Sequence, residues 1–220
     1  MTGICDDRPD GNDRLGLALW LADQQEFVNA SFLFAGLGLR RLTPAQLVCA
    51  GEAHFRAGHA TKARACFRDA VRAFRRAQQR VIDDAELYCW LARAYGYLAL
   101  YSSLPLRVLY AHRSRRYAER VLALNPRHAF ACYVLALWHQ RMPAWIGGRI
   151  DRVDDQLDRA IEYDGGRITF RLARARWNLK RGARQAAHRD LCVVASLPVS
   201  DLDDDRRKIE ALDLLAQMPD

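Results

Sequence analysis

The apolar positions of this chain recur with helical periodicity, and two successive stretches repeat the same pattern. Residues 11–43 and 44–76 fall into register at a spacing of about 33 residues, close to the ~34 of a helix-turn-helix repeat. Small and large apolar residues recur at matching offsets, so that Leu17, Leu21, Ala30 and Phe34 correspond to Ala50, His54, Ala63 and Phe67. One helix pair of this kind cannot bury its apolar side alone, so the pattern predicts stacked pairs.

The same periodicity predicts helix pairs along the rest of the chain. We expect helices over 44–58 and 61–80, a third pair between Asp84 and Pro126, a fourth over 129–141 and 149–163, and a fifth over 167–181 and 183–196. A closing helix over 202–218 would cap the last pair. The predicted fold is an all-α, right-handed α-solenoid of about five helix pairs, with a flexible tail over 1–12, the array over 13–198, and the capping helix and tail over 199–220.

Turn residues punctuate these helices, and two connections are longer than the repeat requires. Thr43 before Pro44 is an N-terminal signal, and Gly58 suits a helix C-terminus. The segment Tyr101–Tyr110 lengthens one turn by about 10 residues, and residues 142–148 form a second long bend. Trp145 in that bend either plugs the edge of the array or belongs to a contact patch with the first insertion.

The second repeat, PAQLVCAGEAHFRAGHATKARACFRDAV, resembles a tetratricopeptide repeat (TPR). Small and aromatic residues stand at the family's positions: Gly51, Gly58, Ala63, Phe67 and Ala70. The later segments WLARAYGYLA and YAERVLALNPRHAFACYVLALWHQRMPAWIGG are similar to helical-repeat proteins of the regulator-of-microtubule-dynamics and TRAP-transporter T-component type. The resemblance implies a non-catalytic adaptor or scaffold that binds protein or peptide in a concave groove.

The resemblance also implies which residues line that groove, because the first helix of each pair faces it. The implied groove residues are Glu52, Phe55, Arg56, Arg93, Tyr97, Tyr133, Gln140, Arg141, Arg176 and Lys180, with Val48 and Leu172 among the apolar positions. Such a groove is basic and aromatic and suits an acidic peptide with apolar anchors. We expect Arg93→Glu with Arg176→Glu to abolish partner binding and leave the melting temperature nearly unchanged.

The formal net charge of +8 makes anionic partners plausible, including nucleic acid or an anionic membrane. Arginines at helical spacing on second helices could follow phosphates: Arg68, Arg72, Arg75, Arg76, Arg113, Arg116 and Arg120. Ordinary solvated helix faces explain these stripes as well, and the sequence holds no recognised nucleic-acid-binding module. A nucleic-acid-binding helical repeat that uses these convex arginines is therefore the alternative function.

Clusters that could carry chemistry are better explained by structure. The carboxylates of Asp151, Asp154, Asp155 and Asp158 are interspersed with arginines, which predicts an ion-paired helix face rather than a metal or acid-base site. His54 and His139 fall at core positions, and no H-E-x-x-H motif occurs. We therefore expect no enzyme activity, no cofactor and no metal.

The cysteines and the termini complete the sequence picture. No two of the six cysteines form a C-x-x-C pair, which predicts small core residues of a reduced protein, with Cys5 alone reactive toward thiol reagents. No secretory signal or membrane-spanning run is evident, so we expect a cytoplasmic protein. Homo-oligomerisation through the two insertions stays open.

Overall fold

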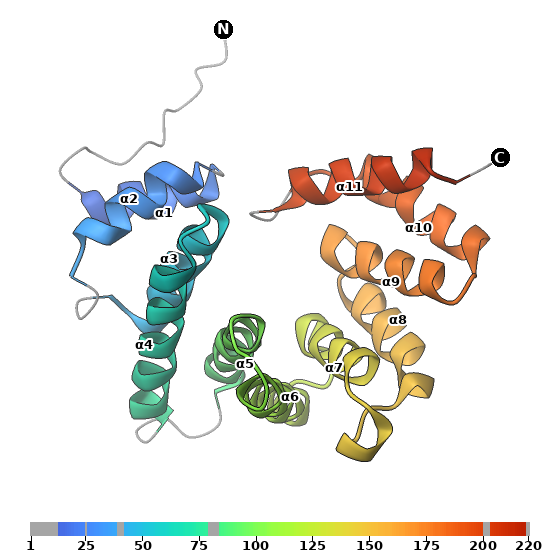
Figure 1. The fold of residues 1–220 in the computed structure, drawn as a ribbon, viewed down its shortest axis with the longest axis horizontal. Helices are drawn as coiled ribbons and strands as arrows, with labels where there is room; N and C mark the ends of the chain where they lie inside the picture. Colours follow the sequence, from blue (N-terminus) through green and yellow to red (C-terminus); the bar gives the residue numbers. More distant parts are fainter. Residues whose placement is uncertain (1–12, 25, 39–41, 79–83, 200–202, 219–220) are drawn as a thin grey trace, which may run out of the picture. The chain divides into compact units, whose positions relative to one another are not determined.

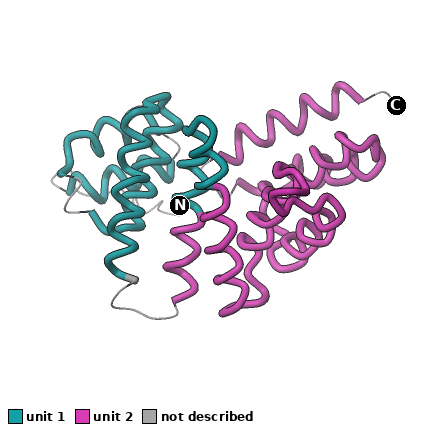
Figure 2. Tube along the Cα trace, turned by 60° about the horizontal axis from the view of Figure 1, so that its bottom comes forward, with its two compact units in different colours: residues 1–82, 93–110 teal, residues 83–92, 111–220 magenta. Residues whose placement is uncertain are grey.

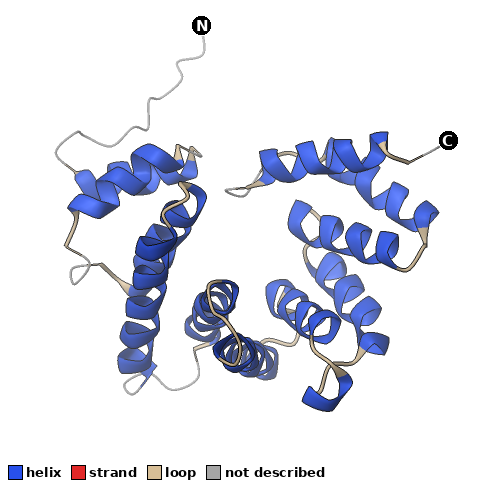
Figure 3. Cartoon of the chain, viewed as in Figure 1, coloured by secondary structure: helices blue, strands red, loops and turns tan. Residues whose placement is uncertain are grey.

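The structure, a computed structural model, describes residues 13–24, 26–38, 42–78, 84–199 and 203–218 (Figure 1). Within these ranges the regular structure is α-helix with short 3-10 turns, and no strand occurs (Figure 3). The all-α prediction is confirmed.

The helices follow the predicted order. Their bounds are α1 Arg14–Asp23, α2 Phe27–Gly36, α3 Pro44–Arg56, α4 Ala60–Gln78, α5 Ala85–Leu100, α6 Leu106–Leu124, α7 Ala129–Arg141, α8 Val153–Tyr163, α9 Ile168–Lys180, α10 Arg184–Ser196 and α11 Asp204–Ala216. Neighbours in sequence pack as antiparallel partners in α1–α2, α3–α4, α7–α8 and α9–α10. This is the helix-pair repeat that the periodicity predicted.

The chain divides into two compact units, shown in teal and magenta in Figure 2. Unit 1 comprises residues 1–82 and 93–110, and unit 2 comprises residues 83–92 and 111–220. Helices α5 and α6 each contribute one part to unit 1 and the other part to unit 2.

In unit 1 the sequence signals for helix ends take the expected form. Thr43 and Gln46 make a reciprocal capping box at the start of α3, and Gly58 adopts a left-handed φ of 78° after it. Gly51 is required by packing, because a Cβ there would lie 2.7 Å from the ring of the fully buried Phe67. The small and aromatic repeat positions thus let α3 and α4 approach closely.

In unit 2 the closing helix covers the last pair. Ile168 and Leu172 of α9, Leu191 of α10 and Ala211 of α11 share one buried cluster. Leu214 packs against it from α11. The predicted capping role of the C-terminal helix is confirmed in its packing.

The first insertion differs from its predicted form. We expected residues 101–110 to lengthen a turn, but the turn spans only 101–105 and α6 begins at Leu106. The Ser103 carbonyl accepts from the Arg107 amide at 3.0 Å, and the Pro105 carbonyl accepts from Leu109 at 3.2 Å. Proline at a helix start needs no amide partner, so the apolar residues after it extend the helix.

Candidate functional site

Two of the predicted groove residues, Glu52 of α3 and Arg93 of α5, bind each other in unit 1. Arg93 donates from Nε to Oε1 at 2.5 Å and from Nη2 to Oε2 at 3.0 Å. Glu52 is only 3% exposed, and a buried carboxylate requires such a fork. Replacing Arg93 by glutamate would put a second negative charge beside Glu52, so the expectation of a stability-neutral variant is corrected.

Aromatic side chains gather beside this pair, still within unit 1. Tyr97 stacks on Phe67 with ring centroids 4.6 Å apart, and Phe55 meets Tyr97 edge-on at 5.8 Å. The Arg56 guanidinium lies over the Phe55 ring at 5.2 Å. Burial raises the pKa of Tyr101, the next aromatic of the cluster, to about 12. The structure thus brings together four of the predicted groove residues: Phe55 and Tyr97 directly, and Arg56 and Arg93 beside them.

In unit 2 the predicted groove residue Tyr133 lies half-buried on α7, and its ring packs 5.3 Å from that of Phe170. Burial raises the pKa of the Tyr133 hydroxyl, and Arg207, Arg141 and Arg176 act in the opposite direction. These arginines stand on α11, α7 and α9 respectively, so three helices of unit 2 direct positive charge toward one phenol.

The cations among the predicted groove residues of unit 2 differ in whether a carboxylate is already paired with them. Arg176 forms a forked ion pair with Glu210 of α11, and its Nε lies 2.6 Å from Oε1. Arg141 and Lys180 are exposed and have no ion-pair partner among the residues that the structure describes. Gln140 is half-buried beside them on α7. The charge open to a ligand is therefore that of Arg141 and Lys180.

Two apolar positions expected on the groove lie elsewhere. Val48 is fully buried, and Leu172 is 1% exposed within the cluster under α11. Helical spacing alone did not separate these positions from their exposed neighbours, because both sides of α3 and α9 carry apolar residues.

Asp154 and Asp158 of α8 are ion-paired, as predicted, but with arginines of α9 or its C-cap. Asp151 pairs with Arg149 at 2.8 Å, and Asp155 accepts from the Gln156 side chain. Asp154 accepts from Arg181 at 2.7 Å, and Asp158 accepts from Arg174 at 2.7 Å. Arg174 also donates two hydrogen bonds, of 2.6 and 2.8 Å, to the buried Asp190 of α10. The described residues contain no cluster of three or more His, Cys, Asp or Glu that could hold a metal ion.

His54 is a buried core residue, as predicted. Its Nδ1 lies 2.7 Å from the Ser31 hydroxyl, which also lies 2.8 Å from Nδ1 of His59. Burial, with Lys62 and His59, lowers the pKa of His54 to about 4. Ser31 and His54 are 1% and 2% exposed, whereas His59 is exposed.

The second predicted core histidine, His139, is also buried. Its Nδ1 has no hydrogen-bond partner among the described residues, and burial lowers its pKa.

The cysteine prediction holds only in part. Cys66 and Cys132 are buried, and burial raises the pKa of Cys66 to about 11. Cys192 is exposed, so the expectation that Cys5 alone is accessible is wrong; Cys5 itself lies outside the described residues.

Trp145 stands in the bend between α7 and α8 and is 85% exposed, which rules out the edge-plug interpretation. Two hydrogen bonds stabilise this bend. The Trp138 indole donates to the Gly147 carbonyl at 3.2 Å, and the Gly148 amide donates to the Pro143 carbonyl at 3.0 Å. Trp145 is thus an exposed aromatic side chain on a hydrogen-bonded bend of unit 2.

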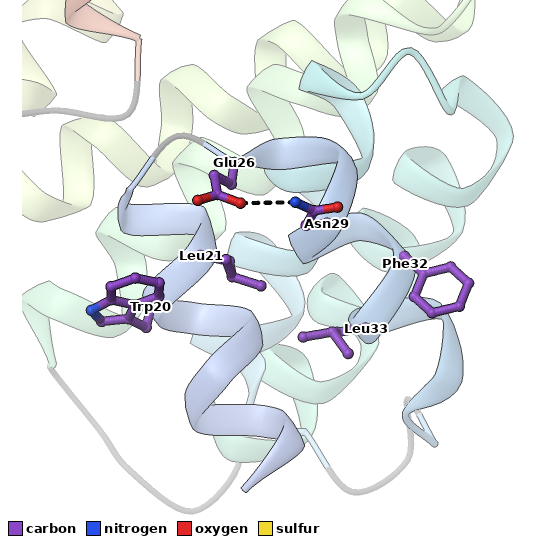
Figure 4. A pocket seen from close by; sticks show the side chains of 6 residues that line it. All are labelled: Trp20, Leu21, Glu26, Asn29, Phe32 and Leu33. Carbon is purple, nitrogen blue, oxygen red and sulfur yellow. Dashed lines mark hydrogen bonds between the residues drawn. The ribbon is translucent and has the colours of Figure 1, made fainter. Parts of the chain in front are cut away.

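A hollow at the first helix pair, shown in Figure 4, was not predicted from the sequence. It has a volume of about 410 Å³ and is lined by Trp20, Leu21, Glu26, Asn29, Phe32 and Leu33. The Asn29 amide donates to Glu26 at 2.8 Å at its rim, and Phe32 is 78% exposed. Its lining offers apolar contact area and one amide-carboxylate pair.

Comparisons with known proteins agree with this architecture. The family model described as "Regulator of microtubule dynamics protein 1-3" matches residues 39–143. A thermophilic TPR protein of Thermus thermophilus is 20% identical with a TM-score of 0.64, over 91% of this chain and 98% of that one. MamA is 16% identical with a TM-score of 0.42, over 92% and 98%. No curated protein matches the sequence.

The likeness to the Thermus thermophilus protein covers nearly the whole of both chains, so the fold is that of a TPR protein. Both resemblances noted in the sequence are therefore supported. In the described part of the chain, no helix is long and apolar enough to cross a membrane.

Proposed function

We propose that this protein is a non-catalytic adaptor that binds acidic protein segments through the first helices of its TPR-type pairs. The TPR fold supports protein partners in general, because stacked helix pairs expose extended surfaces rather than a closed pocket. The observation that carries the acidic preference is the exposure of Arg141 on α7 and Lys180 on α9, two cations with no ion-pair partner among the described residues of unit 2.

Each unit contributes its own contacts to this proposal. In unit 2, Arg141 and Lys180 supply charge for carboxylates, while Tyr133 and Gln140 supply contact area and an amide. In unit 1, Phe55, Arg56 and Tyr97 supply an aromatic surface for apolar anchors. The ion pair between Glu52 and Arg93 supports this surface. In unit 2, the ion pair between Arg176 and Glu210 has the equivalent supporting role. The five described cysteines are free thiols, which suits the reducing cytoplasm.

The test pairs a double charge reversal with a matched control. Arg141→Glu with Lys180→Glu removes the open cations, whereas Arg184→Glu with Arg189→Glu makes the same charge change at exposed positions of α10. Binding to an array of acidic peptides with leucine or phenylalanine anchors is measured for both. The first variant should bind about tenfold or more weakly and the control like the wild type. Equal losses in the two variants would show non-specific attraction and overturn the site.

The alternative is a nucleic-acid-binding helical repeat, favoured by one specific observation. Arg68, Arg75 and Arg76 are exposed on α4 and have no ion-pair partner among the described residues, whereas Arg72 is paired with Asp69 at 2.8 Å. Cations that contact phosphates release counterions, so binding would fall steeply with salt. Titrating DNA and RNA at several salt concentrations against wild type and Arg75→Glu with Arg76→Glu would show a reduced salt slope in the variant.

A further inference from the structure

The turn between α5 and α6 carries the densest group of exposed aliphatic side chains in unit 1. Leu100, Leu104, Leu106 and Leu109, here called the leucine turn, are 52%, 70%, 41% and 44% exposed and lie within ten residues. A water-facing group of this size is unusual for a surface that only meets solvent. The leucine turn is therefore an apolar surface that the rest of unit 1 leaves exposed.

The stretch of sequence that contains the leucine turn carries charges of one sign only. No aspartate or glutamate occurs between Glu86 and Glu119, the stretch that contains the leucine turn. The same stretch carries five arginines: Arg93 and Arg115, which are paired with Glu52 and Glu119, and Arg107, Arg113 and Arg116. A surface that lacks carboxylates and is flanked by arginines complements an anionic one.

Some polar groups of the leucine turn are hydrogen-bonded within it, which lowers the cost of transferring them out of water. The Ser102 hydroxyl donates to the Leu98 carbonyl at 2.8 Å, and the Arg107 Nε donates to the Ser102 carbonyl at 2.9 Å. The Arg107 and Leu109 amides donate to carbonyls within the turn, and Pro105 has no amide hydrogen. Backbone groups that already have partners can enter an apolar boundary without an unpaired polar group.

We propose that the leucine turn docks this protein on an anionic membrane surface. The leucines enter the boundary between headgroups and acyl chains, and the neighbouring arginines meet lipid phosphates and carboxylates. The composition favours lipid over a protein partner, because the anchors of protein interfaces are enriched in Trp, Tyr and Arg whereas leucine is under-represented. A bilayer, in contrast, accepts leucine by its apolar area alone.

Co-sedimentation with vesicles tests this assignment on the full chain. Phosphatidylcholine vesicles with and without phosphatidylserine are compared for wild type, Leu104→Ser with Leu106→Ser, and a matched control. The control is Ile209→Ser with Leu212→Ser, which removes two equally exposed aliphatic residues from α11. We expect binding to the anionic vesicles only, weakened about tenfold or more in the turn variant, unchanged in the control, and reduced by salt.

A second experiment, tryptophan fluorescence, tests whether the leucine turn itself enters the membrane. Leu104→Trp adds one tryptophan to the five of the wild type, and anionic vesicles should shift its emission, taken as the difference between variant and wild type, to the blue. Absence of that shift, or equal vesicle binding by the turn variant and the control, overturns the proposal. A wild-type dimer that becomes a monomer in Leu104→Ser with Leu106→Ser, without vesicle binding, would overturn it in favour of contact between two copies.

Discussion

At the residue scale, two buried carboxylates of this protein are held by arginine forks from a neighbouring helix. Glu52 is held by Arg93 in unit 1, and Asp190 by Arg174 in unit 2. A buried ion pair adds little net stability over an apolar pair of similar volume, but removing one partner leaves an uncompensated buried charge. These pairs therefore fix the relative positions of α3 and α5, and of α9 and α10, more than they add free energy.

The Glu52–Arg93 pair makes this asymmetry measurable. We expect Arg93→Ala to lower the free energy of unfolding by about 3 kcal/mol, because the Glu52 carboxylate stays buried without its partner. The double variant Glu52→Leu with Arg93→Met should recover most of that loss. Urea denaturation of both, with exposed Arg141→Ala as the control, measures the difference. An Arg93→Ala curve that coincides with the control would contradict the structural role.

His54 predicts a pH dependence. Its pKa is about 4 in the folded protein against an ordinary value of 6.5, so the unfolded chain binds more protons between these values. Stability therefore rises with pH across that window and falls as the solution is acidified from 6.5 toward 4. A pKa difference of this size lowers the free energy of unfolding by about 2 kcal/mol between neutral pH and about pH 5.

The check is the slope of unfolding free energy against pH. His54→Gln keeps a group that can bond Ser31 but removes the titration, so its slope should be flatter than that of wild type. His188→Gln, an exposed position on α10, serves as the control. Parallel slopes for wild type and His54→Gln would show that other groups carry the acid sensitivity.

At the element scale, the helices were predictable wherever period and end signals agreed. The helix-start signal at Thr43 and the helix-end signal at Gly58 stand where the sequence predicted them. The start of α6 was missed, because Leu104–Tyr110 has one charged residue, Arg107, among apolar ones and so shows little helical periodicity. Local spacing likewise could not show that Arg174 would meet two carboxylates 16 residues away in either direction.

The residue types of the candidate site were predictable, but the sequence did not show which of its cations are already paired with a carboxylate. The resemblance placed Arg93 and Arg176 on first helices, yet it held no information on Glu52 and Glu210, which neutralise them across helix boundaries. Such pairings depend on the tertiary positions of side chains, and these are not encoded in any single repeat.

The bend that carries Trp145 gives a prediction at this scale. A Cβ on Gly148 would lie 1.7 Å from the Met142 carbonyl oxygen, so Gly148→Ala must displace backbone and lower the free energy of unfolding by about 2 kcal/mol. At Gly36, in the last turn of α2, nothing lies within 4 Å of the same Cβ. Thermal melts of Gly148→Ala and Gly36→Ala should therefore differ, and equal melting temperatures would show that the bend adapts freely.

At the scale of the whole molecule, stability is distributed over stacked pairs, each of which relies on its neighbour. The last pair, α9–α10, has its neighbour in α11, which contributes the fully buried Ala211 to the cluster of Ile168 and Leu191. In a linear array, loss of a terminal contact is felt first by the adjacent pair. The C-terminal helix should therefore control the stability of α9 and α10 before that of any helix in unit 1.

A charge introduced on either side of α11 tests this dependence. Ala211→Asp places a carboxylate in the apolar cluster, where an unpaired charge costs about 3 kcal/mol or more, whereas Ala216→Asp makes the same change at an exposed position of the same helix. Hydrogen exchange should show faster opening of α9 and α10 in Ala211→Asp, with α1–α4 of unit 1 close to wild type. If exchange accelerates equally throughout the chain, the array unfolds as one cooperative block; if α9 and α10 keep wild-type protection, α11 is not the cap that its packing indicates.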